Sequence, residues 1–386
     1  MNDFVYEYPV KVYFGAGSAS KAISEELAQY GPNVLLAYGG GSIRKTGIYD
    51  EITGLLRAAG KNITEFSGIM SNPTYAKVQE GAELARKNHI DFILAVGGGS
   101  VIDCCKIVAA QARMEGDIWE AQYGRGEMPE QMLPTGAVVT AFGTGAEMNN
   151  GAVITNEERL MKAPLAGAYH SFAVLDPEYT MSMPEKQVIS GAFDTLSHCM
   201  ETYFGTPRED NVSDEINEAI MRNVIRNIRR TLKEPGNEHI RSELIWDAAM
   251  AENGILKLGK TTDFQCHMLE HQLGAYTNCN HGQGLAVIHP VLYRHICKDA
   301  PEQFARFAEN VFRIDPEGKT VEETARAGIE ALADFIREIG LPGSFREMNI
   351  GADTDFRAVA DTTMLTGGCC RRLTADELYE ILRECI

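Results

Sequence analysis

The sequence predicts an α/β protein in two domains. Residues 1–184 would form a Rossmann-like domain with a doubly wound, mostly parallel sheet, and residues 185–386 an all-helical domain. Three observations predict this fold class. Short apolar runs alternate with helical patterns in the first part, glycine-rich turns follow two of the runs, and apolar residues beyond Met183-Pro184 recur at three and four positions. A chain of 386 residues also exceeds what one ordinary core needs.

The apolar runs are typical of strands buried on both faces, as in a parallel sheet. They cover residues 34–38, 92–96, 137–141 and 172–175, and glycine or proline interrupts the chain around them. Between the first two, residues 75–88 place Val78, Ala82 and Ala85 on one helical stripe. Strands that alternate with helices predict a doubly wound sheet.

The second domain shows helical periodicity almost throughout. Its first helix is indicated by apolar residues at Val188, Ile189, Ala192, Phe193, Leu196 and Met200. Two further helix starts are indicated by Thr320 with Glu323 and by Thr374 with Glu377, because a hydroxyl and a carboxylate at this spacing satisfy free N–H groups. No linker rich in Gly, Ser or Pro separates the domains.

The overall charge restricts the partners. The formal net charge is -18, which repels nucleic acid and anionic lipid, so neither a nucleic acid nor a membrane partner is expected. No secretion signal begins the chain, and no apolar stretch approaches the ~18 residues of a spanning helix. We therefore expect a cytoplasmic protein.

The cysteines support the same compartment. Nine cysteines in no regular framework indicate reduced thiols. The adjacent pairs Cys104-Cys105 and Cys369-Cys370 form no CxxC motif, and we expect them to be packing thiols.

Two glycine loops indicate a phosphate-bearing cofactor. After one strand come Gly97, Gly98, Gly99 and Ser100, ahead of Asp103, and after an earlier strand come Gly39, Gly40, Gly41 and Ser42. Glycines let the backbone approach a pyrophosphate, and the following helix supplies N–H groups. The alternative is a pair of tight strand-to-helix turns, but two such loops at strand ends of one sheet favour a ligand.

The cofactor expected is NADP(H) rather than NAD(H). An acidic residue near a strand end would bind the ribose 2′-hydroxyl of NAD, yet none follows residues 34–38 before Asp50. Small residues there leave room for a 2′-phosphate, which Arg44 or Lys45 would neutralise. The alternative is that these two cations belong to a solvated helix start. A third turn, from Thr140 through Thr144 to Glu147, also offers hydroxyls and amides to a cofactor.

Five candidate metal ligands fall within the helical domain. Asp194 and His198 are four positions apart, and so are His267 and His271, so each pair occupies one helix face. His281 stands beside Gly282. A lone pair of this kind is more often a surface or core histidine, but two pairs with a third imidazole favour a metal. Nitrogen and oxygen ligands together suit Fe(II) or Zn(II).

A metal on the second domain and a nicotinamide on the first predict one chemistry. Three imidazoles and a carboxylate with an open position make a Lewis-acid site. Such an ion stabilises an alkoxide or polarises an aldehyde carbonyl, while the cofactor carries the hydride. The sequence therefore predicts an oxidoreductase for a small alcohol or aldehyde.

The chain resembles the iron-containing (group III) alcohol dehydrogenases, and within them the NADPH-dependent butanol dehydrogenase or aldehyde reductase branch. The resemblance runs along nearly the whole chain. It is carried by residues 14–17, 38–42, 45–47, 72–73, 97–103, 143–147 and 175–177, and by the series Asp194, His198, His267, His271, His281 and Gly282.

The resemblance implies a dehydroquinate synthase-like architecture, a homodimer and specific site residues. The implied metal ligands are Asp194, His198, His267 and His281, with His271 beside the metal as a substrate or proton-relay residue. The implied cofactor contacts are Gly98, Gly99, Ser100, Thr140, Thr144, Lys162 and Tyr179, and Gly39 stands where NAD-using relatives carry Asp. The chain departs from the family in Ala146, where Ser is usual, and in Phe142, where a small residue is common.

Three other functions are compatible with parts of the sequence. His267, Glu270 and His271 match the HxxEH signature of zinc peptidases. That interpretation leaves Asp194, His198, His281 and both glycine loops unexplained. A polyol dehydrogenase of the glycerol dehydrogenase kind would use the same fold. A nucleotide sensor would need the glycine loops but no Lewis-acid site.

Overall fold

A computed structural model describes residues 1–367 and 370–386. Glu7–Pro184 form one unit, here the α/β unit, and Met1–Tyr6 with Glu185–Ile386 form the other, here the helical unit. The expected boundaries, 1–184 and 185–386, differ from these units at the start of the chain. There the Met1 amino group binds Glu209 at 2.7 Å and the Asn2 amide donates to the Gly259 carbonyl at 2.9 Å. Hydrogen bonds thus attach the first residues to the helical unit, which a sequence pattern does not reveal.

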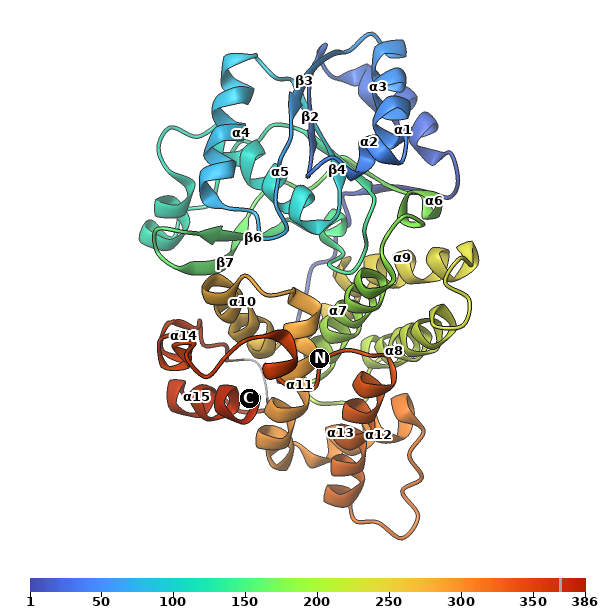
Figure 1. The fold of residues 1–386 in the computed structure, drawn as a ribbon, viewed down its shortest axis with the longest axis vertical. Helices are drawn as coiled ribbons and strands as arrows, with labels where there is room; N and C mark the ends of the chain where they lie inside the picture. Colours follow the sequence, from blue (N-terminus) through green and yellow to red (C-terminus); the bar gives the residue numbers. More distant parts are fainter. Residues whose placement is uncertain (368–369) are drawn as a thin grey trace. The chain divides into compact units, whose positions relative to one another are not determined.

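The α/β unit is built on a six-stranded parallel sheet with the order β1-β8-β5-β4-β2-β3 (Figure 1). The strands are β1 (Lys11–Phe14), β2 (Asn33–Tyr38), β3 (Asn62–Phe66), β4 (Phe92–Gly97), β5 (Thr135–Val139) and β8 (Phe172–Leu175). The doubly wound parallel sheet is confirmed. From β2 the chain moves outward to β3 and then returns to β4 on the other side of β2, so the strand order reverses between β2 and β4. Ligands of such sheets bind at this reversal, beyond the carboxyl ends of the strands.

Helices cover both faces of the sheet (Figure 1). On one face, α1 (Ser18–Glu26) and α3 (Ile48–Ala58) contribute to one core with β2 and β4, in which Leu36 and Leu94 are fully buried. On the other lie α4 (Tyr75–Lys87) and α5 (Gly99–Gln111), which pack against each other. The helix predicted over 75–88 corresponds to α4. Two short helices, α2 (Ser42–Lys45) and α6 (Pro177–Thr180), follow strand ends.

An antiparallel hairpin outside the sheet completes this unit. It consists of β6 (Gly151–Asn156) and β7 (Met161–Ala166), and it packs on α5 through β6. The sequence did not predict it, since Pro164 and the charged turn between the strands interrupt the apolar pattern. The strand expected over 137–141 begins and ends two residues earlier, because the chain leaves the sheet at Thr140 to form the third turn.

The helical unit contains the predicted all-helical arrangement. Its longer helices are α7 (Glu185–Tyr203), α8 (Val212–Thr231), α9 (Glu238–Glu252), α10 (Gln265–Thr277), α11 (His281–Ile296), α12 (Pro301–Phe312) and α13 (Val321–Glu338), followed by α14 (Phe356–Thr362) and α15 (Ala375–Glu384). Helix α11 packs against both α7 and α10. Both predicted capping boxes are present, Thr320 with Glu323 at α13 and Thr374 with Glu377 at α15.

The cysteines that the structure describes are free thiols, and Cys104 and Cys105 are buried on α5. Cys369, expected to be a packing thiol beside Cys370, lies outside the described residues. Within the same described ranges, none of the helices combines the length and apolar character that crossing a membrane requires.

Candidate metal centre and cofactor loops

Three helices of the helical unit supply the candidate metal ligands. Asp194 and His198 lie one turn apart on α7, His267 and His271 one turn apart on α10, and His281 is the first residue of α11. Asn280 caps α11 by accepting from the Gln283 amide, so the chain turns into the helix with His281 at its start. Because α11 packs on both other helices, residues far apart in sequence come together.

One carboxylate oxygen is at the centre of the cluster. Asp194 Oδ1 lies 3.4 Å from His267 Nε2, 3.4 Å from His281 Nε2 and 3.8 Å from His198 Nε2. These separations exceed those of good N–H···O hydrogen bonds. They match the spacing between neighbouring ligands of a tetrahedral ion, which is about 3.4 Å when each ligand lies about 2.1 Å from the metal.

The same atoms lack other partners. Asp194 Oδ1 and His267 Nε2 are buried and make no hydrogen bond within the part of the chain that the structure describes. Buried polar atoms are normally paired, so unpaired atoms that converge on one point indicate a cation site. Asp194, His267 and His281 each bring a ligand atom within 4.8 Å of the others. The donor set therefore fits a divalent metal.

The imidazole ligands are oriented by buried glutamates. His267 Nδ1 contacts Glu201 Oε2, and His281 Nδ1 contacts Glu270 Oε2, both at short range. Both carboxylates are fully buried. A carboxylate on Nδ1 fixes the tautomer and turns Nε2 toward the metal. Glu201 was not among the site residues predicted from the sequence. It lies seven residues after Asp194 on α7, and that spacing puts both side chains on the same helix face.

The protonation of the cluster is also consistent with a cation site. Burial opposes ionisation of Asp194, yet His198 and His281 hold the pKa of its carboxyl well below the usual range. Burial would lower the pKa of His267, but Glu201 and Asp194 raise it to about 10. Positive charge is thus favoured at His267 when no metal is bound, and a metal that binds there displaces the proton.

His271 lies beside the predicted ligands. Its ring stacks on His281 at 5.2 Å between centroids and meets His267 edge-on at 5.8 Å. The neighbouring Glu270 has both oxygens engaged, since Oε2 contacts His281 and Oε1 accepts from the Cys279 thiol at 3.5 Å. This geometry opposes the zinc-peptidase alternative, in which Glu270 would be a free general base.

The loop after β4 is the better formed of the two glycine loops. A β-carbon at Gly99 would stand 2.2 Å from Thr144 Oγ1, one at Gly97 2.5 Å from Val101 Cγ2, and one at Gly98 3.0 Å from the Ala141 β-carbon. Glycine is therefore required for the loop to pack against the third turn. No side chain caps the start of α5, so its first amides are available for a pyrophosphate, and the Ser100 hydroxyl donates to the Ser71 carbonyl.

The loop after β2 lies at the neighbouring strand end. Gly39 is half-buried, and a β-carbon there would stand 3.1 Å from the Ile69 carbonyl oxygen. Gly40 and Ser42 are exposed, and no side chain caps α2. Both glycine loops thus follow the strands between which the order reverses, at the carboxyl edge where sheets of this kind bind ligands.

The two cations of this loop differ in their surroundings. Arg44 donates to Tyr38 Oη at 2.6 Å and to Glu65 Oε2 at 2.6 Å, and its guanidinium lies 3.7 Å from the centre of the Tyr49 ring. Lys45 is exposed and forms no ion pair among the residues described. The sequence predicted that Arg44 or Lys45 would neutralise a 2′-phosphate, but not the pairing of Arg44 with Glu65, which comes from the neighbouring strand β3.

The remaining predicted cofactor residues are distributed over the α/β unit. The Thr140 amide donates to the Gly97 carbonyl at 2.9 Å, which joins the third turn to the first loop. Lys162 is buried on β7 and Tyr179 is buried on α6. Asp103 is partly buried on α5, where its Oδ2 accepts from the Val153 amide at 2.9 Å and so holds the hairpin. The Asp103 side chain therefore has a structural contact of its own, with the backbone of β6.

Comparison with known proteins gives matches along the whole chain. The family described as "Iron-containing alcohol dehydrogenase" matches residues 9–177, and "Fe-containing alcohol dehydrogenase family, C-terminal" matches residues 188–386. A probable NADH-dependent butanol dehydrogenase of Bacillus subtilis is 36% identical over 99% of both chains. The NADPH-dependent aldehyde reductase YqhD of Escherichia coli is 35% identical over 89% of this chain and 88% of that one. The crystal structure of an NADH-dependent butanol dehydrogenase A from Thermotoga maritima superposes with a TM-score of 0.94 at 36% identity, covering 100% of this chain and 99% of that one.

Proposed function

Because the chain belongs to the iron-containing alcohol dehydrogenase family, we propose that it transfers hydride between NADP(H) and a primary alcohol or aldehyde of the butanol and butanal kind. The observation that carries this proposal is the convergence of three imidazole Nε2 atoms on Asp194 Oδ1 at 3.4 to 3.8 Å. The names of the relatives, butanol dehydrogenase and aldehyde reductase, support the substrate class.

We assign the metal to Asp194, His198, His267 and His281, and Fe(II) or Zn(II) suits this donor set. A bound divalent ion would supply Lewis-acid polarisation of the substrate oxygen. Glu201 and Glu270 keep Nε2 of His267 and His281 directed at the site by accepting from Nδ1. Burial of Asp194 and His267 excludes water from the ligand atoms.

His271 is proposed as the residue that exchanges a proton with the substrate oxygen. The centroid of its ring lies 5.2 Å from that of His281. His271 is therefore next to a proposed metal ligand, while the proposed ligand set is complete without it. An imidazole nitrogen can accept a proton from an alcohol and return it to an alkoxide near neutral pH. In the reducing direction, His271 would therefore protonate the product oxygen.

The cofactor would bind through its pyrophosphate to the amides of Gly98, Gly99 and Ser100. Thr140, Thr144, Lys162 and Tyr179 are the further contacts proposed. The preference for NADP(H) rests on the absence of acidic residues between Gly39 and Gly47 and on the exposed cation of Lys45. The relatives are divided on this point, since some are named as NADH-dependent and one as NADPH-dependent. A homodimer is proposed from the family resemblance alone.

The first test is NADPH oxidation with butanal on metal-stripped protein, restored in turn with Fe(II) and Zn(II). We expect turnover to return with metal and to be absent in His267→Ala under every condition. Parallel kinetics with NADH test the cofactor preference, and a higher kcat/KM with NADH would reject it. If NADPH binds but no aldehyde is reduced, polyols are the next substrates, and their turnover would identify the polyol alternative. Binding without any oxidation would indicate a nucleotide sensor.

A further inference from the structure

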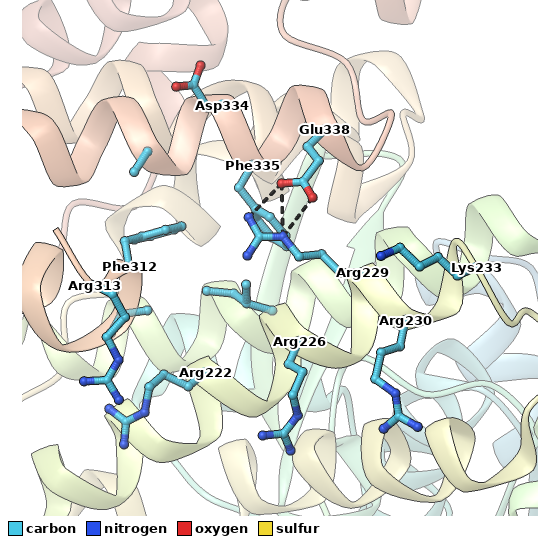
Figure 2. Close-up of a pocket in the computed structure, with 13 residues that line it drawn as sticks. Arg222, Arg226, Arg229, Arg230, Lys233, Phe312, Arg313, Asp334, Phe335 and Glu338 are labelled. Atoms are coloured by element: carbon cyan, nitrogen blue, oxygen red, sulfur yellow. Dashed lines mark hydrogen bonds and ion pairs between the residues drawn. The ribbon is translucent and has the colours of Figure 1, made fainter.

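A groove between α8, α12 and α13 of the helical unit carries a cluster of positive charge (Figure 2). Its volume is about 530 Å³, and two acidic residues, Asp334 and Glu338, also line it. Six cations line this groove, which is called the cationic groove below: Arg222, Arg226, Arg229, Arg230, Lys233 and Arg313. The whole chain has a formal net charge of -18, so a surface that gathers six cations differs in sign from the protein as a whole. None of the lining residues is a candidate metal ligand or belongs to a glycine loop.

Two of the arginines have acidic partners. Arg229 binds Glu338 with two short contacts, Nε to Oε1 at 2.8 Å and Nη2 to Oε2 at 2.7 Å, as the dashed lines in Figure 2 mark. Arg222 donates to the Asn310 carbonyl at 3.0 Å and lies 3.9 Å from Glu218. These two guanidinium groups are at least partly neutralised within the protein.

The other four cations have no ion-pair partner in direct contact among the residues that the structure describes. Arg226, Arg230, Lys233 and Arg313 form no ion pair with any residue that the structure describes. Arg230 donates to the uncharged Asn227 Oδ1 at 3.2 Å, and Arg226 likewise contacts an asparagine. Neutral acceptors satisfy single N–H groups but leave the charge in place.

The spacing along α8 brings these charges close together. Arg222, Arg226, Arg230 and Lys233 follow one another at intervals of four, four and three residues, which places them on adjacent turns of one face. Like charges at this spacing repel each other. The negative end of the helix dipole stabilises cations only in the last turn. Arg222 and Arg226 lie before that turn, so the dipole does not explain them.

Arg313 occupies a backbone position that favours glycine. It is the C-cap of α12 with φ 61° and ψ 34°, in the left-handed region. Glycine is the usual residue there because a β-carbon is unfavourable in that conformation. An arginine at this position brings a charge to the groove at a cost in backbone strain.

We propose that the cationic groove binds a polyphosphate group. Four cations without a direct ion-pair partner around one groove favour a ligand with several negative charges, and arginine forks match phosphate oxygens. A volume of about 530 Å³ is that of a small-molecule site rather than of a protein partner. Beside the cations, Phe312 offers a half-buried aromatic ring to an organic group that carries the phosphates.

The experiment is calorimetric titration of the full chain with inorganic tripolyphosphate. The groove variant is Arg226→Gln/Arg313→Gly, in which the glycine suits the αL backbone and should preserve the fold. The matched control is Lys298→Gln/Arg346→Gln, which removes two exposed cations of the same unit outside the groove. Thermal unfolding of each protein establishes that it is folded.

We expect the groove variant to bind tripolyphosphate at least 10-fold more weakly than both the wild type and the control. Equal affinity in the groove variant and the control, or no binding by any of the three, would overturn the proposal. A second arm with ATP distinguishes the sources of the phosphate. Equal affinities for ATP and tripolyphosphate would identify the phosphate chain as the whole ligand. Tighter binding of ATP that is lost in Phe312→Ala would identify a nucleotide.

Discussion

The candidate metal ligands are oriented by side chains that are not themselves candidate ligands. Glu201 and Glu270 each contact the Nδ1 atom of one imidazole, and both are fully buried. An imidazole that is already held in one tautomer and one orientation loses less conformational entropy when it binds a metal. We therefore treat both glutamates as positioning residues.

Glu201→Gln should weaken metal binding by about 10- to 100-fold, the range seen when such partners are removed. The measurement is titration of the metal-stripped protein with Zn(II), with no turnover involved. Glu218→Gln is the control, because Glu218 is also buried in the helical unit but binds Tyr203 and Arg306 instead. Unchanged zinc affinity in Glu201→Gln would show that the carboxylate does not orient His267.

Glu65 should influence the cofactor preference through Arg44. The Arg44 guanidinium is held by the Glu65 carboxylate at 2.6 Å, so only part of its charge is available to a 2′-phosphate. Glu65→Gln removes the competing charge and keeps an acceptor for the tyrosine and arginine donors. Since exposed ion pairs are worth up to about 1 kcal/mol, kcat/KM for NADPH should rise roughly two- to fivefold, with little change for NADH.

Steady-state kinetics with both cofactors measure this effect. Glu26→Gln is the matched control, because Glu26 binds a tyrosine and a lysine in the same unit, Tyr13 and Lys11. A parallel gain with NADPH and NADH, or none, would mean that Arg44 does not face the 2′-position.

Among single residues, the sequence predicted site residues that lie one turn apart on the same helix. It did not predict the side chains that contact them from another helix or strand. Asp194 and His198 were identified because a spacing of four is visible along the chain. Glu65 and Glu201 were missed, since their partners Arg44 and His267 are 21 and 66 positions away. Nothing in local spacing encodes such a pair.

At the scale of elements, a buried acid joins α8 to α9. Asn223 of α8 donates to both carboxylate oxygens of Asp247 on α9 at 3.0 Å. Burial raises the pKa of Asp247 to about 7, although the hydrogen bonds from Asn223 oppose the change. The folded protein therefore keeps a proton on Asp247 at pH values where the unfolded chain has lost it.

This difference makes stability depend on pH. The contribution of Asp247 is fully present below the unfolded pKa of about 3.9 and is lost as the pH rises through about 7, because the unfolded state binds fewer protons in that window. Asp247→Asn removes the effect, so the gain in unfolding free energy over the wild type should grow between pH 4 and pH 7 to at most about 4 kcal/mol. Urea unfolding at several pH values measures it. Asp353→Asn, at an exposed aspartate, should show no such trend, and a pH-independent difference for Asp247→Asn would contradict the assigned pKa.

Strands could be predicted from the sequence where burial on both faces makes their residues uniformly apolar. β2 and β4 are buried along almost their whole length, and their apolar runs were identified from sequence. The edge strands β1 and β3 carry polar residues such as Lys11 and Glu65, so their pattern is weaker. The hairpin of β6 and β7 was missed because it lies outside the main sheet and contains a proline.

At the scale of the whole molecule, the two ligand sets are separated along the chain. Both glycine loops belong to Glu7–Pro184, and all candidate metal ligands belong to Glu185–Ile386. The change to helical periodicity after Met183-Pro184 is the basis of the predicted domain boundary. The grouping of Met1–Tyr6 with the helical unit depends instead on contacts with Glu209 and Gly259.

Removal of the metal should therefore loosen one unit selectively. Without an ion, Asp194 Oδ1 and His267 Nε2 have no hydrogen-bond partner among the described residues, so an ion would be the central link in the packing of α7, α10 and α11. A ligand that binds only the folded form at 100 times its Kd stabilises that form by about 2.7 kcal/mol.

Hydrogen–deuterium exchange measures this stabilisation segment by segment. With Zn(II) at that excess, amides of α7, α10 and α11 that exchange through unfolding of the unit should exchange roughly a hundredfold more slowly than in stripped protein. Those of β2 and β4 should be unchanged. Asp194→Asn should abolish the difference, and an equal change in both units would show that they unfold together.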